Sequence, residues 1–193
     1  MLLSCMEHIA YRLNQHLKIR FELSEDIVVI SNLVDHDGSV CAHINNRVVI
    51  FITNIEKETA MNLGGAIPNT SSFTTAKPIF LNLYVMVSAN FTGTNYNESL
   101  KFISSVIGFF QAHPVFNHQN SPDLDKKIDK IILDIENVQT QDLSNMWGMF
   151  GAKYVPSILY KVRMITIDDQ AEIARVNRTS NVDVIAETQS DRI

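Results

Sequence analysis

The chain has 193 residues, of which 46% are hydrophobic and 19% charged, a composition typical of one globular domain and not of a disordered segment. The formal net charge of −5 argues against a nucleic-acid-binding protein, which usually carries a basic patch. The apolar runs are too short to cross a bilayer, so we expect no membrane insertion. Cys5 and Cys41 form no CxxC pair and no signal peptide is evident, which predicts a cytosolic protein with reduced thiols.

The N-terminal part of the chain predicts one helix and then short strands. Apolar residues recur at helical spacing over residues 2–21 and predict an amphipathic helix. Residues 27–30 and 47–54 are rich in β-branched residues and predict two strands, with a weaker strand at 40–44. Asp37-Gly38 between them is a strong turn signal.

Residues 56–77 form the longest stretch without a clear pattern. The stretch contains a Gly-Gly pair and a polar run, and predicts a long loop with at most a helical turn near 58–63. Loops of this length in compact domains are usually functional or disordered. It is therefore a candidate binding segment.

The strongest strand pattern covers residues 78–89. One set of alternating residues is purely aliphatic and should meet the helices. The other set is mixed, so we expect that face to be covered only partly, or covered by another subunit. It comprises Phe80, Asn82, Tyr84, Met86 and Ser88.

The C-terminal half predicts helices at 97–113 and 141–150 and strands at 128–135 and 157–168. Asn97 and Thr140 are the expected N-caps, and Gly151 the expected C-cap. This order of elements predicts an α+β fold in which a mixed, mostly antiparallel sheet is flanked by helices. We expect a single domain over 1–168, followed by an extension or arm over 169–193.

Residue patterns that would indicate catalysis or metal binding are absent from the sequence. Asp35-His36-Asp37 fits a turn better than a metal loop. No nucleophile elbow, P-loop or dinucleotide fingerprint occurs. Trp147, the one tryptophan, fits core packing better than ligand binding. We therefore expect no catalytic residue, cofactor or metal, and a protein that binds other proteins.

Three segments carry a resemblance to a known family. They are residues 48–61 (VVIFITNIEKETAM), residues 78–88 (PIFLNLYVMVS), and a pattern of Leu, Trp, Tyr, Ser and Tyr within residues 142–168. In this order and spacing the chain resembles the tail-terminator, or cap, family of phage-tail-like extracellular contractile injection systems, the antifeeding-prophage and virulence-cassette type. The residues of the third pattern, which the resemblance implies to be packing residues, are Leu143, Trp147, Tyr154, Ser157 and Tyr160.

The resemblance implies a non-enzymatic protein that forms a hexameric ring on the distal end of the inner tube and sheath. Such a ring ends polymerisation and stabilises the extended sheath; it is cytoplasmic during assembly and then part of the contractile particle. We expect exposed strand edges and arms to dock on the tube or sheath by strand addition. We expect ring contacts on the mixed face of 80–88, and sheath or tube contacts on the loop 56–77 and the tail. The candidate partner-binding residues are Glu56, Met61, Asn62, Phe73, Lys77, Asp168 and Asp169.

Two other functions remain open from the sequence. A transient assembly chaperone or adaptor for the same tail complex would share the fold and the lack of catalysis. An unrecognised small hydrolase would need a nucleophile with a base within hydrogen-bond reach.

Overall fold

A computed structural model of the protein describes residues 1–58, 79–91 and 93–166. Two 3₁₀ turns, η1 (Ala42–Ile44) and η2 (Gly93–Asn95), accompany the helices and strands. In chain order these are α1 (Leu2–Phe21), β1 (Val28–Ile30), β2 (Arg47–Lys57), β3 (Ile79–Asn90), α2 (Tyr96–Ala112), β4 (Val115–Asn117), β5 (Ile128–Ile135), α3 (Thr140–Phe150) and β6 (Ser157–Thr166).

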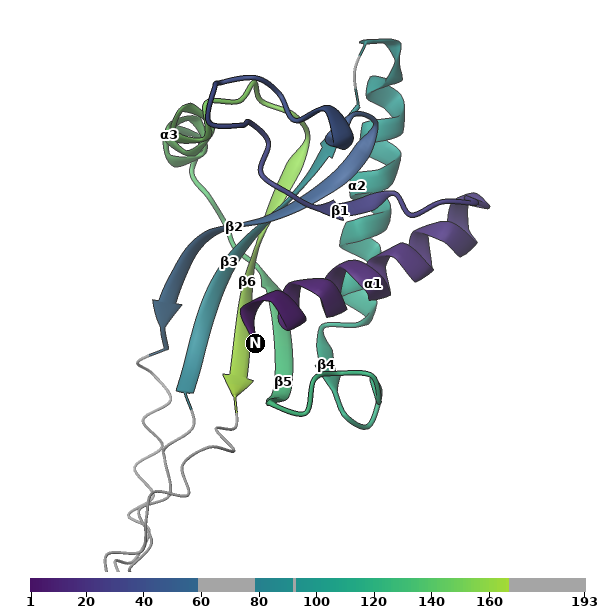
Figure 1. The fold of residues 1–193 in the computed structure, drawn as a ribbon, viewed down its shortest axis with the longest axis vertical. Helices are drawn as coiled ribbons and strands as arrows, with labels where there is room; N and C mark the ends of the chain where they lie inside the picture. The colour runs from purple at the N-terminus through teal and green to yellow at the C-terminus, as the bar shows by residue number, and fades with distance from the viewer. Residues whose placement is uncertain (59–78, 92, 167–193) are drawn as a thin grey trace, which may run out of the picture.

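The strands form one sheet in the order β1-β2-β3-β6-β5-β4. β1 runs parallel to β2, and every other neighbouring pair is antiparallel. Figure 1 shows the long strands β2, β3 and β6 side by side, with α1 crossing the sheet and α3 at the other end of the molecule from the N-terminus. The predicted α+β class with a mixed, mostly antiparallel sheet is confirmed.

The larger hydrophobic core lies between α1, α2 and one face of the sheet. It contains the aliphatic residues of β3, namely Leu83, Val85 and Val87, so the prediction that this side of the strand meets the helices is confirmed. At its centre Phe110 of α2 and Tyr160 of β6 pack edge to face, with ring centroids 5.1 Å apart. The residues of α1 buried here are Cys5, Met6, Ile9, Ala10, Leu13 and Leu17.

The opposite face of the sheet is covered at one end only. There α3 and the loop before β2 enclose a smaller core around Trp147, which is 5% exposed. The Trp147 ring packs edge to face against Phe150, and Phe150 does the same against Phe51 of β2. The other end of this face carries the polar residues described below. The mixed side of β3 is therefore only partly open: Met86 and Ser88 are buried, and Tyr84 is half-buried.

Three strand predictions differ from the structure. No strand forms at 40–44, because the turn at Gly38 (φ 83°) leads directly into η1 and leaves only a single bridge between Val34 and Val40. β2 continues to Lys57, because pairing with β3 outweighs the low strand propensity of its last residues. β4 was not predicted, since three residues are too few to show an alternating pattern.

Of the three capping residues predicted from the sequence, one is confirmed and two differ in the structure. Gly151 is the C-cap of α3 with φ 67°, as predicted. The N-caps are Asn95 and Gln139 instead of Asn97 and Thr140, and neither side chain caps its helix with a hydrogen bond. Both helices therefore begin without the side-chain cap that the sequence suggests.

Burial of Cys5 predicts a loss of stability in alkali. The side chain is 0% exposed, and burial raises the pKa of its thiol from 9.0 to about 12. The unfolded chain ionises this thiol at a lower pH than the folded chain, so the stabilisation is complete below pH 9 and declines as the pH rises toward 12. In urea titrations across this range, the unfolding free energy should fall more steeply for the wild type than for Cys5→Ala. Parallel curves would contradict the prediction.

Candidate docking surface

Three strand ends meet at one end of the sheet. β2 and β3 pair as far as Lys57 with Leu81, and β3 pairs with β6 as far as Ile79 with Thr166. The strand ends that flank the two segments predicted to bind partners, on β2, β3 and β6, therefore lie at the same end of the sheet (Figure 1). The sequence places these segments far apart, and only the strand order brings their anchor points together.

The part of the second sheet face next to these strand ends carries two rows of polar residues, most of them exposed or half-buried and one, Asn82, 3% exposed. We call this surface the polar face. In one row, β2, β3 and β6 contribute Glu56, Asn82 and Arg163 in register. The neighbouring row runs across four strands as Asn54, Tyr84, Lys161 and Asp134.

Hydrogen bonds and an ion pair link the polar face across strands. Tyr84 Oη donates to Glu56 Oε2 at 3.1 Å, and Asn82 Nδ2 donates to Glu58 Oε2 at 2.9 Å. Arg163 forms an ion pair with Asp134. Burial of the hydroxyl raises the pKa of Tyr84, and the hydrogen bond to Glu56 and the negative charge of Glu56 raise it further. Tyr84 therefore stays protonated and acts as a donor.

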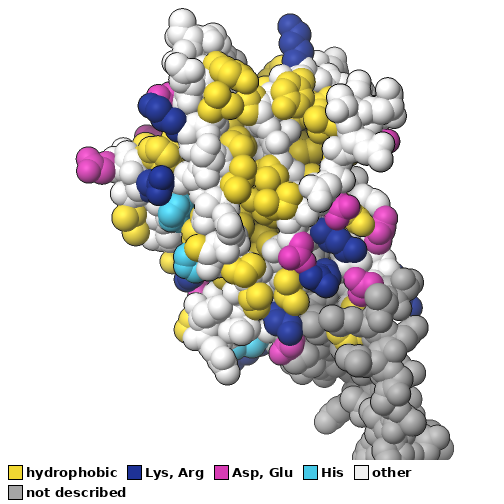
Figure 2. Space-filling view, turned by 180° about the vertical axis from the view of Figure 1, so that it is seen from behind, with side chains coloured by type: hydrophobic (Ala, Val, Ile, Leu, Met, Phe, Trp, Pro, Cys, Tyr) yellow, Lys and Arg dark blue, Asp and Glu magenta, His cyan; other side chains and the backbone are white. Residues whose placement is uncertain are grey.

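Lys161 is the cation that this network leaves available. It lies between Tyr84 and Asp134 in the register, and it forms no ion pair within the described ranges. Figure 2 shows acidic and basic side chains gathered beside the grey residues, at the end of the sheet where the polar face lies. A surface with alternating charges and exposed donors suits recognition of another protein surface.

Two serine–histidine contacts are the nearest approach to catalytic machinery. Ser31 Oγ lies 2.8 Å from His43 Nε2, and Ser105 Oγ lies 3.2 Å from His16 Nε2. Neither histidine contacts a carboxylate in the described part of the chain, so the group that orients the base in a hydrolase is missing from both pairs. Residues 1–58, 79–91 and 93–166 also contain no group of three acidic, histidine or cysteine side chains placed to hold a metal.

A groove of about 820 Å³ lies beside α3, between the turn after this helix and the loop before β2. The buried Trp147 and the exposed Tyr154 line it, with their ring centroids 5.5 Å apart. Val40 and Lys153 lie on its wall. This groove is a separate concave surface at the far end of the molecule from the polar face.

The five motif residues are divided among the smaller core, the larger core and more exposed positions. Trp147 and Leu143 pack in the smaller core, and Tyr160 lies in the larger one. Tyr154 is 59% exposed, and Ser157 is half-buried opposite Ser88.

Of the candidate partner-binding residues, Glu56 lies in β2 on the polar face. The others lie outside the described residues: Met61, Asn62, Phe73, Lys77, Asp168 and Asp169. Lys161 and Arg163 were not predicted as site residues. Their spacing of two residues along a strand could have indicated that both lie on one face of the sheet. Only the strand register shows which residues of the neighbouring strands lie beside them.

Together, the helices and the mixed six-stranded sheet define a small α+β domain. None of its described helices is long and apolar enough to cross a bilayer. The chain belongs to the Pvc16 N-terminal domain family, whose model matches residues 6–181. No curated protein matches the chain.

Two solved structures are similar in fold. One is the sheath/tube terminator of the extracellular contractile injection system PVC in its extended state, with a TM-score of 0.59 and 13% identity over 100% of this chain. The other is the tube-terminating cap of the anti-feeding prophage, with a TM-score of 0.49 and 13% identity over 89% of this chain. The chain spans 65% of the length of the first protein and 58% of the second.

Proposed function

We propose that this protein is a non-enzymatic terminator, or cap, of a contractile injection system. In this role it forms a hexameric ring on the distal end of the inner tube and sheath, ends their polymerisation and stabilises the extended sheath. The observation that carries the proposal is the family match over residues 6–181. The shared fold with the PVC sheath/tube terminator supports it.

The polar face is suited to the contacts that such a ring needs. Six copies placed around an axis make identical head-to-tail contacts that close on themselves. Lys161 offers an available cation for an acidic group on the neighbouring copy, while Arg163 and Asp134 are already paired. Each exposed charge contact between copies is weak, but six of them act together in a closed ring.

The common end of β2, β3 and β6 gives the ring one side on which to meet the tube and sheath. β2 and β6 are separated only by β3, and Lys57 and Thr166 lie at this common end of the sheet. We place the tube and sheath contacts on the loop 56–77 and the tail 169–193. The groove beside α3, at the opposite end, then lies away from the tube.

The copy number in purified particles tests the proposal. A cap stays on the particle at six copies per tube end, and particles assembled without it contain tubes and sheaths of uncontrolled length. A transient chaperone or adaptor is instead absent from finished particles. Particles of normal length that lack the protein would therefore refute the terminator role and favour the chaperone.

Reversing the charge of Lys161 should weaken ring closure. Lys161→Glu places a carboxylate beside Asp134, and we expect about a tenfold lower cap occupancy on purified particles. Lys126→Glu makes the same change in net charge at an exposed lysine outside the polar face, and should leave occupancy unchanged. Equal occupancy of both variants, at equal folding stability, would remove Lys161 from the ring contact.

A further inference from the structure

The edges of the sheet are where another strand could add. An edge strand presents unpaired N–H and C=O groups, and a second chain can pair with them. β1 and β4 are the two edge strands here, and β2 has no strand on its outer side beyond Ile50. The backbone groups that point outward from these three stretches therefore decide whether a strand can add there.

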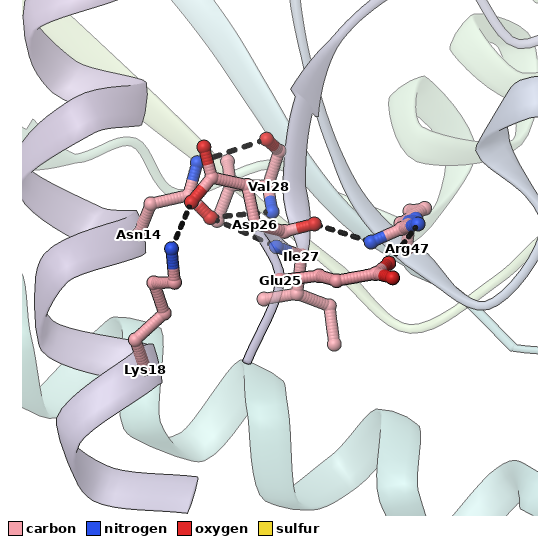
Figure 3. Close-up of polar contacts among 7 residues, drawn as sticks. All are labelled: Asn14, Lys18, Glu25, Asp26, Ile27, Val28 and Arg47. Atoms are coloured by element: carbon pink, nitrogen blue, oxygen red, sulfur yellow. Dashed lines mark hydrogen bonds and ion pairs between the residues drawn. The ribbon is translucent and has the colours of Figure 1, made fainter. Parts of the chain in front are cut away.

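On β1, an asparagine from α1 occupies the outward groups. Val48 N donates to Ile27 O, and Ser31 N donates to Ile50 O, so the groups of Val28 point away from β2. Asn14 Oδ1 accepts from Val28 N at 2.8 Å, and Asn14 Nδ2 donates to Val28 O at 3.0 Å (Figure 3).

On β4, a second asparagine occupies the outward groups in the same way. Leu133 N donates to Pro114 O, which places Val115 O and Asn117 N on the outer side of the strand. Asn120 Oδ1 accepts from Asn117 N at 2.9 Å, and Asn120 Nδ2 donates to Val115 O at 2.8 Å.

On β2, a third asparagine occupies an outward amide. Glu58 N donates to Phe80 O, so every second residue from Glu58 backwards faces β3. Ile55 belongs to the other set, and its amide points away from β3. Asn54 Oδ1 accepts from Ile55 N at 2.9 Å. The register between β2 and β3 also shifts between Ile52 and Asn54, and a bulge of this kind turns an edge away from regular pairing.

We infer that Asn14, Asn54 and Asn120 are edge-sealing residues that prevent a second copy of this chain from adding a strand to the sheet. An asparagine amide has one acceptor and two donors, so its side chain can satisfy the N–H and C=O that an incoming strand would need. Asn14 and Asn120 each hold an outward N–H and C=O, and Asn54 holds an outward N–H while its Nδ2 donates to Glu56. The three residues come from a helix, a loop and a strand. Sealed edges direct association to the polar face and the strand ends.

This inference goes beyond the proposed function, since it concerns association of the protein with itself. It also changes one expectation from the sequence: strand addition is opposed at the edges of the described sheet. A terminator with these seals would bind a tube while offering no strand edge to a further subunit.

The test is self-association of Asn54→Ala/Asn120→Ala, which removes the two exposed seals and leaves the buried Asn14 in place. The variant frees three outward backbone groups for pairing with a second copy, so it should form species larger than the wild-type assembly at about tenfold lower concentration. Sedimentation velocity over a concentration series measures the shift, and the infrared signal of intermolecular β-sheet identifies its cause. Asn97→Ala/Asn145→Ala is the matched control, because it removes two exposed asparagines from helices and should behave like wild type.

Hydrogen exchange shows whether the seals have been removed. The amides of Ile55 and Asn117 should exchange slowly in the wild type and faster in the variant. Faster exchange with no added association would overturn the inference, and so would unchanged slow exchange, because the asparagines would then not be the seals. If the double variant does not fold, Asn54→Ala alone supports the same two measurements. None of these outcomes depends on binding to a tube or sheath.

Discussion

Replacing Asn14 with alanine is expected to lower the free energy of unfolding by about 3 kcal/mol. The side chain is 6% exposed and makes three hydrogen bonds to the chain entering β1. Alanine would leave the amides of Ile27 and Val28 buried without an acceptor, and each such group costs about 1–3 kcal/mol. Chemical denaturation of the two proteins measures the difference.

Lys18→Ala is the control on the same helix. Lys18 pairs with Asp26 at 2.8 Å in an exposed position (Figure 3), so its loss should cost less than about 1 kcal/mol. A cost below about 1 kcal/mol for Asn14→Ala as well would show that the entry to β1 does not depend on this side chain.

Replacing Trp147 with alanine is expected to cost about 4 kcal/mol. The indole is the largest side chain of the smaller core, where it contacts Phe150 and Tyr154 and holds α3 against the sheet. Trp147→Phe should cost less than half as much, because the indole Nε1 has no hydrogen-bond partner among the described residues and phenylalanine leaves a smaller void.

Met149→Ala provides the comparison within α3. Met149 is 70% exposed, and its truncation should change the unfolding free energy by less than about 0.5 kcal/mol. Urea titrations of all three variants give the ranking. A cost of about 1 kcal/mol or less for Trp147→Ala would mean that α3 is held mainly by other contacts.

The helical and long-strand parts of the fold were predictable from the sequence, because burial imposes a period on the residues. The spacing of apolar residues along α1 and the alternation of β3 each follow from one face meeting the core. β4 was not predictable in this way, since a strand of three residues shows no period. The end of β2 was missed because its last residues are charged and are held by pairing with β3.

The polar face was not predictable, because it depends on which strands are neighbours. Tyr84, Lys161 and Asp134 come from three strands far apart in the sequence, and the order β3-β6-β5 places them in one row. Asn14 did leave a signal, since it is a polar residue between Leu13 and Leu17 on the buried side of α1. A buried polar residue requires hydrogen-bond partners, but the sequence does not say that they lie at the edge of a sheet.

The pairing of β2 with β3 has a consequence for how much the chain between these two strands can vary. Because the two strands are neighbours, the chain leaves the sheet at residue 58 and returns at residue 79, about one strand spacing, roughly 5 Å, away. The free energy of closing such an excursion changes only slowly with its length. Residues 59–78 can therefore be exchanged as a cassette of different length and chemistry while the sheet that carries them stays the same.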